Sequence, residues 1–169
     1  MARRSRDRGR EGFSLAEAVL ATSIVGIGIA ALLTSVGAGT RTNAAGRDMT
    51  QATFLAQEFR ELTLKLPWSD PDLADQGNPP GSDGAAPETF VDDLDDLLNG
   101  VTYTPPRNGY FGQITDMPGW SQQVTFTWRS PSNPATVVSP GPTDLVHIQM
   151  DVLYNGNTTL TTGWLTAKK

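Results

Sequence analysis

Glu17 is the residue whose position most clearly suggests chemistry. It is the last charged residue before a run of 22 residues, 18–39, that contains no charge, no proline and no asparagine. As a helix, this run would be about 33 Å long, close to the thickness of a bilayer core. A carboxylate within lipid costs up to about 2–3 kcal/mol and is usually retained for a function. Glu17 is therefore a candidate functional residue.

An acidic cluster in the middle of the chain supplies a second group of candidates. The cluster is Asp92, Asp93, Asp95 and Asp96, with Asp70, Asp72 and Asp75 nearby in sequence. Carboxylate oxygens are calcium ligands, although the spacing here does not fit an EF-hand loop. The alternative is a solvated acidic start of a helix over residues 88–100, where negative charge suits the helix dipole. Calcium is thus a weak candidate ligand, and no other metal or cofactor is predicted.

The remaining polar residues do not form a catalytic set. The chain has no cysteine and one histidine, His147, which excludes thiolate chemistry, disulfides and a multi-histidine metal site. We expect His147 on the exposed face of a strand, without a partner. No phosphate-binding loop, nucleophile elbow or pair of catalytic carboxylates occurs, so the chain is predicted not to be an enzyme. Four tryptophans are expected to pack in or beside the core: Trp68, Trp120, Trp128 and Trp164.

Charge is distributed unevenly along the chain. Residues 1–12 contain five arginines and two acids, a net charge of +3. The whole chain has 13 Lys and Arg against 18 Asp and Glu, so residues 13–169 keep eight basic and 16 acidic residues, a net charge of −8. Such an acidic protein is a poor partner for nucleic acid. The basic leader is a separate, local signal.

The basic leader followed by residues 18–39 predicts a single membrane-spanning helix. By the positive-inside rule, the N-terminus is expected in the cytoplasm and the acidic remainder outside it. A secretory signal peptide, a twin-arginine signal and a plain signal anchor are alternative interpretations. The apolar run is long for a signal peptide, and Arg3-Arg4 lacks the usual twin-arginine context. None of the three alternatives accounts for Glu17.

Residues 12–17, GFSLAE, follow the basic residues and precede the apolar run. In sequence and in this position they resemble the signal of type IV prepilins and type II secretion pseudopilins. The resemblance implies cleavage by a prepilin peptidase between Gly12 and Phe13, methylation of Phe13 and a role for Glu17 in assembly. Gly12 suits an extended peptide in a protease cleft because it has no side chain. Glu17, four residues along the helix, can face the new amine or that of a neighbouring subunit.

The resemblance also implies partners and a location. The partners are prepilin peptidase, other pilin or pseudopilin subunits, an inner-membrane assembly platform and the lipid bilayer. The precursor would cross the bacterial inner membrane once, and the assembled subunit would lie in a periplasmic or extracellular filament. Many major pilins have a proline that kinks the helix, whereas the corresponding residues 34–37, TSVG, contain none. This departure favours a minor subunit, in which nearby glycines could weaken the helix instead.

Two other functions remain as alternatives. A non-polymerising single-pass receptor or adaptor would use its acidic head to bind a ligand or calcium. A competence pseudopilin would contact DNA, which the net charge of −8 disfavours.

The expected fold class is α+β, with a pilin-like long N-terminal helix packed on a small antiparallel sheet. The expected segments are a leader peptide, 1–12, a transmembrane and polymerisation helix, 13–40, and a soluble head, 41–169. Within the head we expect an amphipathic helix, an acidic loop region and a β-meander, at residues 44–66, 67–119 and 120–167.

The helix in the head is predicted from an apolar stripe. Apolar residues recur at spacings of three and four: Ala45, Met49, Ala52, Leu55 or Ala56, Phe59, Leu62 and Leu66. Glu61 and Lys65 are expected to form an ion pair on the opposite face. Pro67 is expected to end the helix.

The strands are predicted from alternation. Apolar residues occupy every second position in QQVTFTWRS and DLVHIQMDVLY, and Asn155-Gly156 predicts a two-residue type I′ turn into a third strand. Residues 130–143 are expected to be a loop. A further short strand is expected at residues 101–104.

Overall fold

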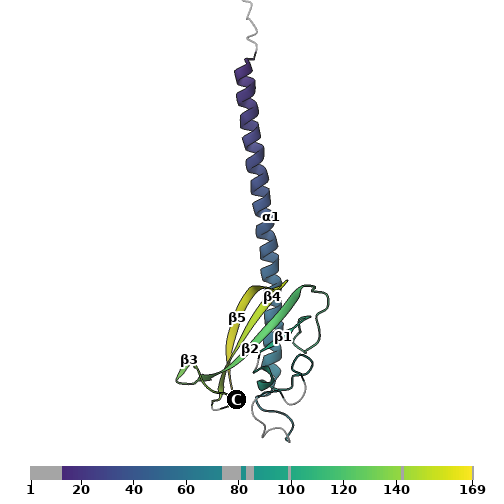
Figure 1. The fold of residues 1–169 in the computed structure, drawn as a ribbon, viewed down its shortest axis with the longest axis vertical. Helices are drawn as coiled ribbons and strands as arrows, with labels where there is room; N and C mark the ends of the chain where they lie inside the picture. Colours follow the sequence, from purple (N-terminus) through teal and green to yellow (C-terminus); the bar gives the residue numbers. More distant parts are fainter. Residues whose placement is uncertain (1–12, 74–80, 83–85, 99, 142, 169) are drawn as a thin grey trace, which may run out of the picture. The chain divides into compact units, whose positions relative to one another are not determined.

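The computed structural model describes residues 13–73, 81–82, 86–98, 100–141 and 143–168. The leader, including Gly12, lies outside these residues, as does Asp75. The chain divides into two compact units, Met1–Ala45 and Gly46–Lys169. Helix α1, Leu15–Lys65, contributes residues to both units, and the five strands belong to the second (Figure 1).

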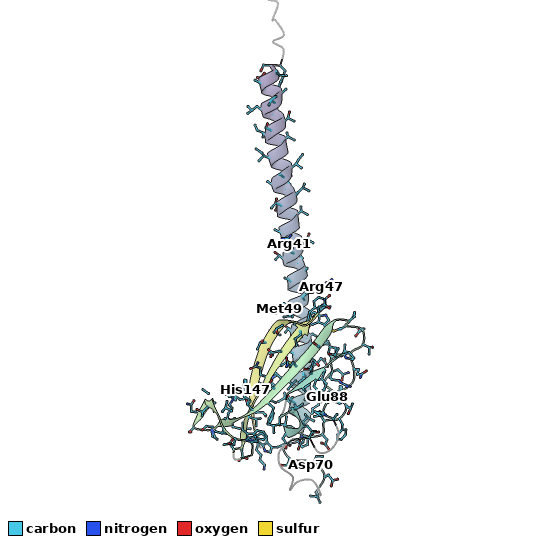
Figure 2. The ribbon with its side chains drawn as sticks, in the orientation of Figure 1. Arg41, Arg47, Met49, Asp70, Glu88 and His147 are labelled. Carbon is cyan, nitrogen blue, oxygen red and sulfur yellow. The ribbon has the colours of Figure 1, made fainter. Side chains whose placement is uncertain are left out.

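In the first unit, the described part is an exposed apolar helix. Large apolar side chains on it are more than half exposed, and they include Leu20, Ile24, Ile27 and Leu32. Side chains project from it along its length in Figure 2. The helix is long and apolar enough to cross a membrane, and 0% of its most apolar stretch is buried. A helix that is apolar all round is stable in lipid or against other helices, and not in water.

In the second unit, one face of α1 packs in the core. Its buried apolar residues are Ala52, Leu55, Ala56, Phe59 and Leu62. The predicted stripe is thus confirmed in its centre. It is wrong at its start, because Ala45 is exposed and Met49, labelled near Arg47 in Figure 2, is 46% exposed.

The predicted Glu61–Lys65 ion pair is also wrong. Lys65 Nζ donates to the carbonyl oxygen of Gly109 at 2.9 Å and lies 3.8 Å from the ring centroid of Tyr110. A buried carbonyl and an aromatic face compete successfully with an exposed carboxylate, whose ion pair contributes little in water.

Within the described residues, the sheet has five antiparallel strands. They are β1 (Val101–Tyr103), β2 (Trp120–Ser130), β3 (Asn133–Val137), β4 (Leu145–Tyr154) and β5 (Asn157–Ala167). The order is β1-β2-β4-β5, and β3 pairs with the C-terminal end of β2, at Arg129 and Ser130 (Figure 1). One helix on one antiparallel sheet is an α+β layout. The predicted three-strand meander corresponds to β2, β4 and β5, but residues 130–143 contain β3 and are not only a loop.

Alternation along the strands builds the core. Val124, Phe126 and Trp128 of β2 are buried, as are Ile148 and Met150 of β4. Because side chains alternate between the faces of a strand, the polar residues between them face outward. The predicted turn is confirmed, since Asn155 and Gly156 both have positive φ, 49° and 79°, as a type I′ turn requires.

The predicted helix over residues 88–100 is wrong. The described residues there contain one 3₁₀ turn, Asp95–Leu97. Asp93 Oδ1 accepts hydrogen bonds from the backbone N–H groups of Asp95 and Asp96, at 2.9 and 3.2 Å. Aspartate side chains that bind nearby backbone compete with helix formation, which explains the difference.

Candidate functional site: the N-terminus of α1

Ser14 and Glu17 form a capping box at the start of α1. The backbone N–H of Glu17 donates to Ser14 Oγ at 3.2 Å, and the backbone N–H of Ser14 donates to Glu17 Oε2 at 3.0 Å. The first turn of a helix has N–H groups without intrahelical partners, and this reciprocal pair satisfies two of them. The negative carboxylate also lies at the positive end of the helix dipole.

The capping box changes the interpretation of Glu17. In the sequence Glu17 is a single charge at the start of an apolar run, and in the structure it has Ser14 as a partner. A carboxylate has about four acceptor positions, and this hydrogen bond occupies one of them. Glu17 is exposed, so the other positions face outward. The same side chain can therefore cap its own helix and accept a hydrogen bond from an ammonium group.

Ser14 is the site residue that sequence reasoning missed. The signal was present, because Ser-x-x-Glu before an apolar run is the capping-box pattern. Of the predicted cleavage site, Gly12 lies outside the described residues. Phe13 is the first described residue, and 82% of it is exposed.

The acidic cluster does not converge on a metal. In the described part of the chain, no three His, Cys, Asp or Glu side chains are arranged to hold a metal ion. Asp93 and Asp96 are both buried. The carboxylate of Asp93 accepts from the backbone N–H groups of Asp95 and Asp96, and that of Asp96 accepts from the backbone N–H of Asp92. Gly81 N–H donates to Asp95 Oδ2 at 2.9 Å. These carboxylates organise the loop, and the alternative of a solvated acidic helix start is wrong for Asp93 and Asp96.

Burial gives the acidic cluster unusual protonation properties. The pKa of Asp93 is raised from 3.8 to about 8, first by burial and then by the hydrogen bond and charge of Asp95. The pKa of Asp92 is also raised, by burial and by the nearby charges of Asp96 and Asp70. A neutral Asp93 carboxyl is therefore favoured in the folded head.

His147 has a partner, which contradicts the prediction. It lies on β4, where Figure 2 labels it. Its Nδ1 is 3.4 Å from an Nη atom of Arg129, and its ring lies over Gly163 of β5. Burial and the positive charge of Arg129 lower the pKa of His147. Trp120 and Trp128 lie in the core, and Trp68 and Trp164 pack beside it, as predicted.

Three comparisons with known proteins give no significant match: none to a protein-family model, none to a curated protein and none to a solved structure. The functional interpretation therefore depends on the residues and geometry described above.

Proposed function

We propose that this chain is a minor subunit of a type IV pilus or a type II secretion pseudopilus. It would be made as a membrane-anchored precursor, cut between Gly12 and Phe13 by a prepilin peptidase, methylated on Phe13 and assembled through α1. The observation that carries the proposal is the order of features along residues 1–39. A basic leader, GFSLAE and a capped apolar helix follow one another without interruption.

The chemistry at the start of α1 supports this proposal. Cleavage after Gly12 would create an ammonium group on Phe13, directly before the residue whose N–H binds Glu17. Glu17 could then accept from this ammonium or from that of a neighbouring subunit. In apolar surroundings such a charge pair is strong, and an unpaired carboxylate is costly. Pairing would favour subunits that enter the filament in the correct axial register.

The organisation of the rest of the chain also supports the proposal. The exposed apolar residues of α1 need lipid or other helices around them. The second unit joins the end of the same helix to an antiparallel sheet, and this α+β layout is compatible with a pilin-like head. The precursor would sit in the bacterial inner membrane with the leader in the cytoplasm.

Processing at Gly12 is the direct test. The full chain is produced in bacteria with and without an active prepilin peptidase, and the membrane fraction is analysed by mass spectrometry. With the peptidase, we expect the chain to begin at Phe13 and to carry one methyl group on its amine. Gly12→Val should block cleavage, because a β-branched side chain replaces a hydrogen atom in the protease cleft.

Gly9→Val is the matched control, because it makes the same change in the same leader three residues earlier. It should be processed normally. An intact leader on the unmodified chain in cells with active peptidase would contradict the proposed function, as would equal processing of Gly12→Val and Gly9→Val.

A further inference from the structure

Strand β5 forms one long edge of the sheet. Among the described residues it pairs with β4 alone, and it is the last strand in the order β1-β2-β4-β5. Its eleven residues, NTTLTTGWLTA, contain no charge and no proline. Charges, prolines and short strands are the usual protection of sheet edges, and β1 at the other edge has three residues. The edge of β5 is therefore long, and its protection is limited to one register irregularity near its start, opposite Val152 and Leu153.

Two cavities lie along the seam between β5 and α1. One has a volume of about 310 Å³, with Thr53 to Arg60 of α1 on one wall and Leu160 to Trp164 of β5 on the other. The second, about 400 Å³, is lined by the next residues of both elements, from Thr63 of α1 and from Thr166 of β5, and by Trp68. We call these two cavities and the edge between them the α1–β5 groove.

The core-side residues of β5 are incompletely covered in this groove. Leu160, Thr162 and Trp164 pair with Val152, Met150 and Ile148 of β4, which are 0% exposed. The three β5 residues are only half-buried. Trp164 Nε1 is itself buried and has no hydrogen-bond acceptor among the described residues. A buried indole N–H normally has a hydrogen-bond acceptor. The groove therefore lacks an acceptor for Trp164, and its apolar side chains are incompletely covered.

The charge of the groove restricts what could fill it. Of the described residues that line the two cavities, the charged ones are Arg60 and Lys168, and both are basic. This contrasts with the net charge of −8 on residues 13–169. Complementary charge selects partners, and a basic groove on an acidic protein favours an acidic occupant.

We propose that the α1–β5 groove binds an extended acidic segment of a partner protein as an additional strand. Backbone groups of the segment pair with the free edge of β5, which is the general mode of recognition by strand addition. Its side chains cover Leu160 and Trp164, and its carboxylates lie opposite Arg60 and Lys168. The inference concerns the head alone and does not require Glu17 to direct assembly.

Thiol protection can test this directly, because the chain has no cysteine. Thr162→Cys places a single thiol in the groove, and Thr125→Cys places one on the outer face of β2. The probe is a peptide of threonine and valine that has the length of β5 and one glutamate near each end. The full chain in detergent is alkylated with and without this peptide. We expect the peptide to slow alkylation at position 162 and not at position 125.

Charge reversal tests the specificity of the groove. In the Thr162→Cys background, Arg60→Glu should raise the peptide concentration needed for protection about tenfold. Arg47→Glu, on the same helix but outside both cavities, should leave it unchanged. Melting curves of each variant establish that the head is folded.

Three results would overturn the inference. One is the absence of protection by the glutamate peptide while the head is folded. Another is equal protection by a matched peptide with lysines in place of the glutamates. The last is protection at position 162 that rises with protein concentration alone, which would show that a second copy fills the groove.

Discussion

At the scale of single residues, Glu17 has one role that the structure shows and a second that we propose. Its carboxylate closes the capping box with Ser14, and its charge would pair with an ammonium group in the proposed assembly. Removing the side chain abolishes both. Glutamine separates them, because it also closes a capping box but carries no charge.

We expect Glu17→Gln to leave leader cleavage largely intact and to reduce filament incorporation nearly as much as Glu17→Val. The reason is that the proposed assembly step needs the charge pair, while the cap contributes only about 1 kcal/mol. The measurement is the ratio of cleaved subunit in sheared filaments to that in membranes. Ser14→Ala is the control, because it removes the cap partner and keeps the charge. Normal incorporation of Glu17→Gln would assign Glu17 to capping alone.

At the scale of elements, Gln122 of β2 links this strand to α1 and to Arg107, which lies in the segment between β1 and β2. Its side chain is 0% exposed. Nε2 donates to the carbonyl oxygens of Leu55 and Arg107, at 2.9 and 3.1 Å, and Oε1 accepts from Arg107 N–H at 2.7 Å. Nearby, Gly109 N–H donates to Glu58 Oε2 at 2.8 Å. A polar side chain on the core face of a strand thus holds the loop on the helix.

Gln122→Leu should lower the free energy of unfolding by about 1–3 kcal/mol, because the half-buried Arg107 loses the acceptor of its backbone N–H and the donor to its carbonyl oxygen. The leucine side chain buries more apolar area than glutamine, but it cannot replace the lost hydrogen bonds. Chemical unfolding of the full chain in detergent, followed by tryptophan fluorescence, measures the difference. Gln123→Leu is the matched control, since Gln123 is the next residue and is exposed. Equal stability of both variants would show that the buried network contributes nothing.

At the scale of the whole molecule, protonation of Asp93 is linked to the folding of the head. Its pKa is raised to about 8 in the folded protein, against 3.8 as the ordinary value. Because the folded state holds this proton more tightly, the contribution of Asp93 to stability is complete below about pH 4. It is lost as the pH rises towards 8.

Asp93→Asn should therefore weaken the decline of the melting temperature between pH 4 and pH 8. Asparagine keeps an oxygen that can accept from Asp95 and Asp96 and never becomes charged. Thermal unfolding of the full chain across this pH range is the measurement. Asp116→Asn, at an exposed position, is the control and should follow the unmodified chain. An unchanged pH dependence in Asp93→Asn would show that this carboxyl does not control the stability of the head.

The local parts of the fold could be predicted from sequence. The amphipathic stretch up to Leu62, the alternation in β2 and β4, and the Asn155-Gly156 turn each depend on residues close together in the chain. The capping box of Ser14 and Glu17 was equally local and could have been found by its pattern. Met49 could not be assigned from periodicity alone, because burial requires an opposing surface as well as an apolar stripe.

The order of basic residues, GFSLAE and apolar helix can be read from the sequence alone, since composition and short spacings carry those signals. Which polar groups are buried, and which surfaces stay open, follows only from how the elements pack together. Asp93 is buried in the head, although the backbone N–H groups that it binds belong to its own loop. The α1–β5 groove exists because β5 ends the sheet beside a helix that does not fully cover it. The burial of Asp93 and the α1–β5 groove both depend on segments that are distant in the chain, which no local pattern records.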